Sequence, residues 1–232
     1  MSGADTLARA PERLGAWDRY WFGEASLVRL GAFRIAIMLV TFWDVVGYSY
    51  LVFPDAAAVS AGAPIRAWRP IYLFEMVDLQ PIGLPAAQWV YGLLLVAILA
   101  AALGVCTRLA CIVVAVLAFY WSGLAYSFGK PHHDKVALTF ALWALPLAPV
   151  GARLSFDHIV RRYRAVRRGA EPDSAEDRGL FALLPIRLTQ WTVAIGYGAA
   201  GWSKVLMGGT GWLNGYTQQG IVMGHDNVWS AA

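Results

Sequence analysis

Charged residues are scarce in this sequence. Asp, Glu, Lys and Arg make up 15% of its 232 residues, against roughly 25% in an ordinary soluble domain. Cysteine is scarcer still, with Cys106 and Cys111 alone. Their spacing matches no C-x-x-C motif and places them on different helix faces, so we expect two buried or interfacial thiols and no metal site. Hydrophobic residues are abundant instead, at 58%.

The hydrophobic residues gather in long uncharged runs such as "GLLLVAILAAALGV" and "LACIVVAVLAFYWSGL". A helix needs roughly 20 apolar residues to cross a bilayer. The runs predict an all-α fold, a polytopic transmembrane helix bundle within 26–206. We expect five spans, at about 26–53, 86–106, 109–128, 134–150 and 184–206. The fourth holds Pro146 and Pro149, so we expect it to be broken, tilted or only partly spanning.

Four segments lie outside these spans. Residues 1–25 include "WDRYWFG", which suits the headgroup region. Residues 54–85 read as an outer-surface excursion in which "IYLFEMV" forms a short interfacial helix. Residues 151–183 read as a basic cytoplasmic loop against anionic lipid, and 207–232 as an extracytoplasmic C-terminal segment.

The arginines predict how the bundle is oriented. Eleven lie in the segments on one side of the five spans, against four basic residues on the other side before the last span. Cytoplasmic segments carry the excess of Lys and Arg. We therefore expect an integral membrane protein with a cytoplasmic N-terminus and an extracytoplasmic C-terminus. The basic cluster is explained by lipid, and we expect no nucleic-acid partner.

Among the charged residues within the expected spans, four need an explanation: Arg29, Arg34, Asp44 and Lys204. The two arginines are near the cytoplasmic end, and we expect both to snorkel to the headgroups. Asp44 lies about 22 Å further along the helix than Arg29. An aspartate at that depth needs a partner.

Several polar and aromatic residues are expected at the same outer level as Asp44. They are Lys130, His132 and His133 between the third and fourth spans, with Tyr126, Tyr197 and Trp202. The adjacent histidines point in different directions, which argues against a metal, and His133 or Asp134 can cap the fourth helix. Two interpretations stay open: Asp44 and Lys204 clamp two helices, or the residues form a pocket.

The chain resembles the membrane core of the vitamin K-dependent gamma-carboxylases and their bacterial relatives, the horizontally transferred transmembrane domain proteins. The resemblance runs from about Ser26 to Gln219 and rests on the order of five blocks. These are "GAFRIAIMLVTFWD", "LGVCTRLAC", "KPHHDKVAL", "LSFD" and "LPIRLTQWTVAIGYGAAGWSKVLMGGTGWLNGY".

The resemblance implies a membrane-embedded site for reduced vitamin K or another quinol, in a bacterial inner membrane. In that family a lysine at the outer end of the third span deprotonates the quinol, whose anion reacts with oxygen to form the base for glutamate carboxylation. Lys130 is similar to this lysine, and His133 to a nearby histidine. The carboxylases continue well past the fifth span with segments that hold a protein substrate, so we do not expect full carboxylase activity here.

Our first hypothesis is a quinone or lipid pocket open to the outer leaflet. Lys130 or His133 would exchange protons with the head group, and Asp44 and Lys204 would shape the site. Four aromatic residues would line a flat ring: Trp121, Tyr126, Tyr197 and Trp202. Such a site is an apolar cleft with a few convergent polar groups.

The second hypothesis is a non-enzymatic accessory subunit packed in a larger membrane protein complex. It is favoured by the small size of the chain and its 11 tryptophans. A transporter is a third interpretation, which the absence of a visible inverted repeat weakens.

Overall fold

The computed structural model of the chain describes residues 15–63, 68–128, 135–169 and 177–209. The chain divides into two compact units, Met1–Thr189 and Gln190–Ala232. All the contacts reported below lie within the first unit.

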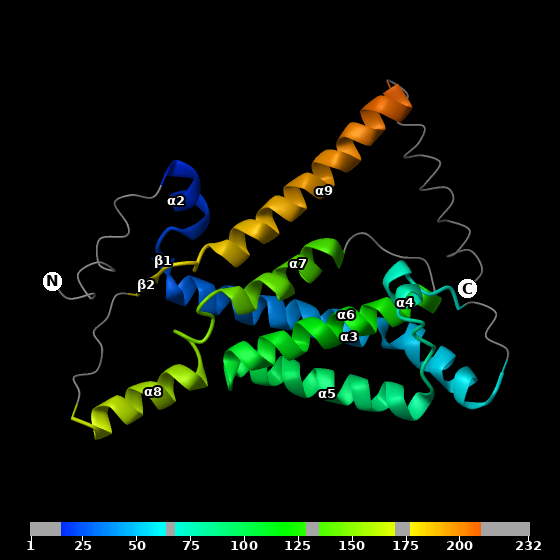
Figure 1. The fold of residues 1–232 in the computed structure, drawn as a ribbon, viewed down its shortest axis with the longest axis horizontal. Helices are drawn as coiled ribbons and strands as arrows, with labels where there is room; N and C mark the ends of the chain where they lie inside the picture. The colour runs from blue at the N-terminus through cyan, green and yellow to red at the C-terminus, as the bar shows by residue number, and fades with distance from the viewer. Residues whose placement is uncertain (1–14, 64–67, 129–134, 170–176, 210–232) are drawn as a thin grey trace, which may run out of the picture. The chain divides into compact units, whose positions relative to one another are not determined.

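Most of the described residues are helical (Figure 1). The helices are α2 (Ala16–Phe22), α3 (Leu27–Ser60), α4 (Tyr72–Met76), α5 (Leu84–Leu103), α6 (Thr107–Phe128), α7 (Val136–Ala144), α8 (Phe156–Arg167) and α9 (Leu184–Gly208), with a 3-10 turn η3 at Leu145–Leu147. Two short strands, β1 (Ala25–Ser26) and β2 (Arg178–Gly179), pair antiparallel with Ser26 opposite Arg178. The predicted all-α class is thus confirmed in the described part of the chain, with this one strand pair added.

Three helices, α3, α5 and α6, are long and apolar enough to cross a membrane. The fourth expected span is a shorter apolar stretch, Val136–Leu147. It is broken as expected, because α7 ends at Ala144 and η3 follows with Pro146. Helix α9 has the length of a span but is not among the three. Five spans are therefore not confirmed.

The core of the first unit lies where α3, α5 and α6 pack against one another (Figure 1). Trp121 of α6 is 1% exposed. Its ring centroid lies 5.6 Å from that of Phe53 on α3 and 5.3 Å from that of Tyr91 on α5. Because aromatic rings at such distances attract one another beyond their burial, this cluster fixes the three helices at one level.

The short helix expected in "IYLFEMV" is present as α4, and its position depends on α6. Ser127 accepts a hydrogen bond from the Ile71 N–H at its hydroxyl, 3.3 Å, and from the Arg69 N–H at its carbonyl, 2.8 Å. Phe74 packs where a Cβ on Gly123 would be, only 2.5 Å from the ring. Gly123 therefore makes room for α4 to dock.

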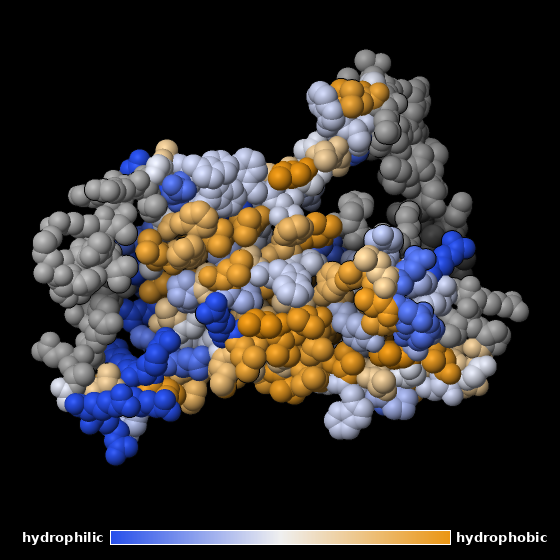
Figure 2. Space-filling view, viewed as in Figure 1, coloured by the Kyte–Doolittle hydropathy of each residue, from blue (hydrophilic) through white to orange (hydrophobic). Residues whose placement is uncertain are grey.

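The basic segment predicted as a cytoplasmic loop between two spans contains a helix, α8, which was not predicted from the sequence. Ser155 begins it by accepting a hydrogen bond from the His158 N–H, 3.0 Å, as an N-cap does. An apolar stripe at helical spacing lies opposite its arginines: Phe156, Ile159, Tyr163 and Val166. Figure 2 shows the hydrophilic residues gathered over α8, and an apolar band over α5. The charge of this segment concealed its helical period.

Candidate functional site

The most unusual polar group within the apolar helices is an ion pair between Asp44 and Lys135. The side chains are 16% and 12% exposed. The Lys135 ammonium also lies over the ring of Tyr48, with Nζ 3.4 Å from the ring centroid. One lysine therefore contacts a carboxylate and an aromatic face at the same time, which are the two kinds of group that stabilise a cation away from water.

The helices place these three residues for simple reasons. Asp44 and Tyr48 are four residues apart on α3, so they lie one above the other on one face. Lys135 precedes the first residue of α7 and serves as its N-cap. Helix α7 contacts both α3 and α6, and the junction therefore brings the lysine to the α3 face.

A small cavity adjoins the ion pair. Its polar lining, besides Asp44 and Lys135, consists of Thr41, Ser122 and Thr139, and its apolar wall includes Phe119 and Leu138. The cavity volume is about 10 Å³, which is room for about one water molecule. Hydroxyls, a carboxylate and an ammonium around such a space form a set of groups that can bind a small polar group and pass a proton.

The residues predicted for the site are brought together only in part. Lys130, His132 and His133 lie outside the described residues. Lys204, Tyr197 and Trp202 lie on α9 in the second unit. The ion pair that the structure gives to Asp44 is with Lys135. Trp121 and Tyr126 lie on α6, and neither is among the residues that line the cavity. Lys135 was not singled out from the sequence. Its position directly before an apolar helical stretch was the available signal.

Arg34 does not snorkel, which corrects the expectation for this residue. Its side chain is 0% exposed. The guanidinium donates to the carbonyls of Val150 and Leu154, both at 2.6 Å, and of Ala102 at 3.3 Å. Arg29, in contrast, is exposed as expected. Arg34 therefore ties α3 to the end of α5 and to the segment between η3 and α8, and its role is structural.

Asp157 of α8 caps the first turn of α6. Its carboxylate accepts hydrogen bonds from the Cys106 N–H at 3.0 Å, and from the N–H and the hydroxyl of Thr107, both at 2.7 Å. Partial burial raises the pKa of this carboxyl, but the hydrogen bonds from Thr107 and Cys106 and the charge of Arg161 outweigh it, and the pKa lies below its ordinary value. The carboxylate is thus held in its charged form where it binds α6.

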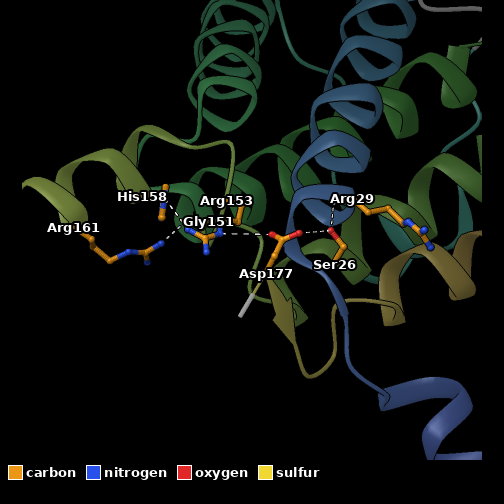
Figure 3. A network of polar contacts seen from close by, with 7 residues as sticks. All are labelled: Ser26, Arg29, Gly151, Arg153, His158, Arg161 and Asp177. Atoms are coloured by element: carbon orange, nitrogen blue, oxygen red, sulfur yellow. Dashed lines mark hydrogen bonds and ion pairs between the residues drawn. The ribbon is translucent and has the colours of Figure 1, made fainter. Parts of the chain in front are cut away.

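A chain of polar contacts continues from α8 toward the start of α3 (Figure 3). Arg161 donates to the Gly151 carbonyl, Arg153 contacts the His158 ring at 3.1 Å, and Arg153 also pairs with Asp177 at 3.6 Å. Asp177 accepts a hydrogen bond from the Ser26 hydroxyl at 2.9 Å. Burial and the neighbouring arginines 153, 161 and 162 lower the pKa of His158. These contacts join the predicted cytoplasmic segments to one another.

The described residues contain no group of three or more His, Cys, Asp or Glu that could hold a metal ion. The prediction of no metal site therefore stays a prediction for the complete chain.

Comparison of the chain with protein-family models, curated proteins and solved structures finds no match.

Proposed function

We propose that the protein is an integral membrane protein that binds the head group of a quinone or lipid at the Asp44–Lys135 pair, where Lys135 exchanges a proton with it. The observation that supports this is the position of Lys135 between the carboxylate of Asp44 and the ring of Tyr48, beside a cavity lined with hydroxyls. Ionisable residues within membrane helices are rare, and they usually mark proton pathways or ligand sites.

The size of the cavity determines how a ligand binds. Room for about one water molecule does not accommodate a ring, so the head group must displace the Lys135 ammonium from Asp44. The ring then takes the place of the ammonium on the face of Tyr48. The flexible lysine side chain stays within reach of the ligand oxygen, because its four-carbon stem pivots at the start of α7.

The chemistry at that oxygen is a proton transfer. With a quinol, the Lys135 ammonium first gives its proton to the Asp44 carboxylate. The neutral amine then accepts the quinol hydroxyl proton and becomes an ammonium beside the quinol anion, with Asp44 left neutral. With a quinone or a lipid carbonyl, the ammonium donates a hydrogen bond and no bond is broken. In the absence of ligand, the negative charge of Asp44 stabilises the Lys135 ammonium. In this proposal Lys135 takes the proton-transfer role that the family resemblance implies for Lys130, while Lys130 and His133 lie outside the described residues.

The membrane orientation is part of the same proposal. The three apolar helices support a membrane location, and the arginine distribution supports a cytoplasmic N-terminus. A bacterial inner membrane is what the family resemblance implies. With this orientation, Asp44 and Lys135 face the outer half of the bilayer.

The test is a calorimetric titration of the purified chain in mild detergent with a short-chain quinone and its quinol. Lys135→Met should weaken binding by tenfold or more, which corresponds to about 1.4 kcal/mol. The matched control is Arg69→Ala, which removes an exposed cation on the same predicted side. Equal binding by wild type and Lys135→Met, with helical content retained, contradicts the proposal.

Asp44→Asn provides a second variant in case Lys135→Met does not fold. It removes the competing carboxylate and leaves the lysine in place. Because the ligand then has no ion pair to break, we expect quinone binding to be retained or strengthened. Loss of binding in a folded Asp44→Asn protein would mean that the carboxylate itself contacts the ligand.

A further inference from the structure

A second cavity lies at the other end of α3, where the chain enters the helix. It has a volume of about 310 Å³ and lies around the paired strands β1 and β2. Its lining residues include three arginines from three separate segments: Arg29 of α3, Arg178 of β2 and Arg187 of α9. Glu24 is the single acidic residue among them. The excess of positive charge in one hollow distinguishes it from the cavity beside Lys135.

The three arginines are not neutralised by the part of the chain that the structure describes. No ion pair joins any of them to a described carboxylate. Asp177 directly precedes Arg178 in the sequence. Its carboxylate already forms an ion pair with Arg153 and accepts a hydrogen bond from the Ser26 hydroxyl. Figure 3 shows the Arg29 side chain pointing away from Asp177. Three arginines against one glutamate leave the hollow with a net positive charge, so the arrangement favours an anion from outside.

Arg187 gives the most direct sign of a missing partner. Its guanidinium carbon lies over the Tyr20 ring, 3.8 Å from the ring centroid, so the side chain is held against an aromatic face. One of its terminal nitrogens, Nη1, is buried and has no hydrogen-bond partner among the described residues. Buried donors of this kind are almost always paired. A donor that is fixed in place and unpaired is ready to bind an acceptor.

The backbone favours the same kind of ligand. Ser26 caps α3 by accepting a hydrogen bond from the Arg29 N–H, 3.3 Å, and Ser26 itself lines the cavity. The hollow therefore lies at the N-terminus of a 34-residue helix, where the helix dipole attracts negative charge. The helix dipole adds to the attraction that the three arginines exert on an anion.

We propose that this cavity binds a phosphate-type anion. The guanidinium groups of Arg29, Arg178 and Arg187 would hold its oxygens, because the planar fork of arginine matches phosphate geometry with two parallel hydrogen bonds. The phosphate comes from the head group of an anionic membrane lipid or from free phosphate in solution. Leu183, which lines the same hollow, gives an apolar contact that a lipid would use and free phosphate would not.

The experiment uses the full chain reconstituted in nanodiscs of phosphatidylcholine alone, or with a minority of phosphatidylglycerol. The thermal midpoint is measured in each membrane, and in phosphatidylcholine with added inorganic phosphate. Native mass spectrometry counts the phosphatidylglycerol molecules that the protein retains. The variants are Arg29→Gln with Arg178→Gln as a double change, Arg187→Gln, and the control Arg69→Gln, an exposed arginine outside both the cavity and the basic segment 151–183.

Retention of phosphatidylglycerol by wild type and by Arg69→Gln, with at least about tenfold weaker retention in the two site variants, supports the proposal with lipid as the source. Stabilisation by inorganic phosphate that the site variants lose supports it with free phosphate as the source. Equal retention and equal stabilisation in all four proteins would overturn it. The double variant keeps the test decisive, because Arg187→Gln also removes the Tyr20 contact and can affect folding.

Discussion

Gly104 approaches Ser155 so closely that a Cβ atom on Gly104 would lie 2.3 Å from the Ser155 Cβ. The same glycine ends α5 in the left-handed conformation, with φ at +75°. Its carbonyl accepts the Asp157 N–H at 3.0 Å. One residue without a side chain thus allows the α5–α6 turn and the start of α8 to meet.

We expect Gly104→Ala to destabilise the protein more than an ordinary glycine substitution. The left-handed backbone alone costs about 1–2 kcal/mol for an L residue, and the clash with Ser155 adds to it. Gly92→Ala is the matched control, because Gly92 is exposed on the same helix and a Cβ there meets nothing within 4 Å. Thermal unfolding in detergent should show a lower midpoint for Gly104→Ala and an unchanged or slightly higher one for Gly92→Ala.

Acid should weaken the contact between α8 and α6. The pKa of Asp157 lies below its ordinary value of 3.8 in the folded protein, so folding releases protons from this group. Its contribution to stability is therefore present above pH 3.8 and is lost as the pH falls through the folded value. His158 has the same sign, because its pKa is also lowered, from an ordinary value of 6.5. The contribution of His158 to folding stability therefore weakens as the pH falls below 6.5.

Asp157→Asn isolates the carboxylate in this pH dependence. We expect a loss of about 1 kcal/mol at neutral pH, because the neutral amide keeps one acceptor oxygen where the carboxylate accepts three hydrogen bonds with two, and a flatter decline of the unfolding midpoint in acid. Asp78→Asn changes an exposed aspartate beside α4 and should reproduce the wild-type profile. A wild-type acid profile in Asp157→Asn would show that other carboxyls carry the effect.

Arg34→Met should lower the unfolding midpoint strongly. It leaves the carbonyls of Val150 and Leu154 without their donor. The Val150 carbonyl is buried, and an unpaired buried group costs about 1–3 kcal/mol. Arg34→Lys keeps the charge but cannot reach three carbonyls with a fixed fork, so we expect an intermediate loss. Arg162→Met on exposed α8 is the control. A midpoint like that of wild type in Arg34→Met would mean that Arg34 reaches the headgroups after all.

Much of the fold could be predicted from the sequence, because long apolar runs bounded by Gly, Pro or Arg locate helices directly. Helices α5 and α6 begin and end within three residues of the expected bounds. Helix α8 was missed because five arginines hid the apolar period of Phe156, Ile159, Tyr163 and Val166. The Ser155 cap was the available signal.

The candidate site could be predicted only in part, because partners in a bundle depend on which helix faces meet. Asp44 stood out as an aspartate in an apolar run that needed a cation. Nothing in the sequence distinguishes Lys135 from Lys204 as that cation, since the choice depends on how α7 approaches α3. The burial of Arg34 has the same origin, because it depends on carbonyls more than a hundred residues away in sequence.

The most direct test of a head-group site at Asp44 and Lys135 is native mass spectrometry of the protein released from its own membrane in mild detergent. We expect a bound mass that matches a quinone or a lipid in the wild type, retained in Arg69→Ala and lost in Lys135→Met. A protein that leaves the membrane with stoichiometric protein partners and no small ligand would contradict the proposal. It would favour the accessory subunit, with the Asp44–Lys135 pair serving only to clamp α3 to α7.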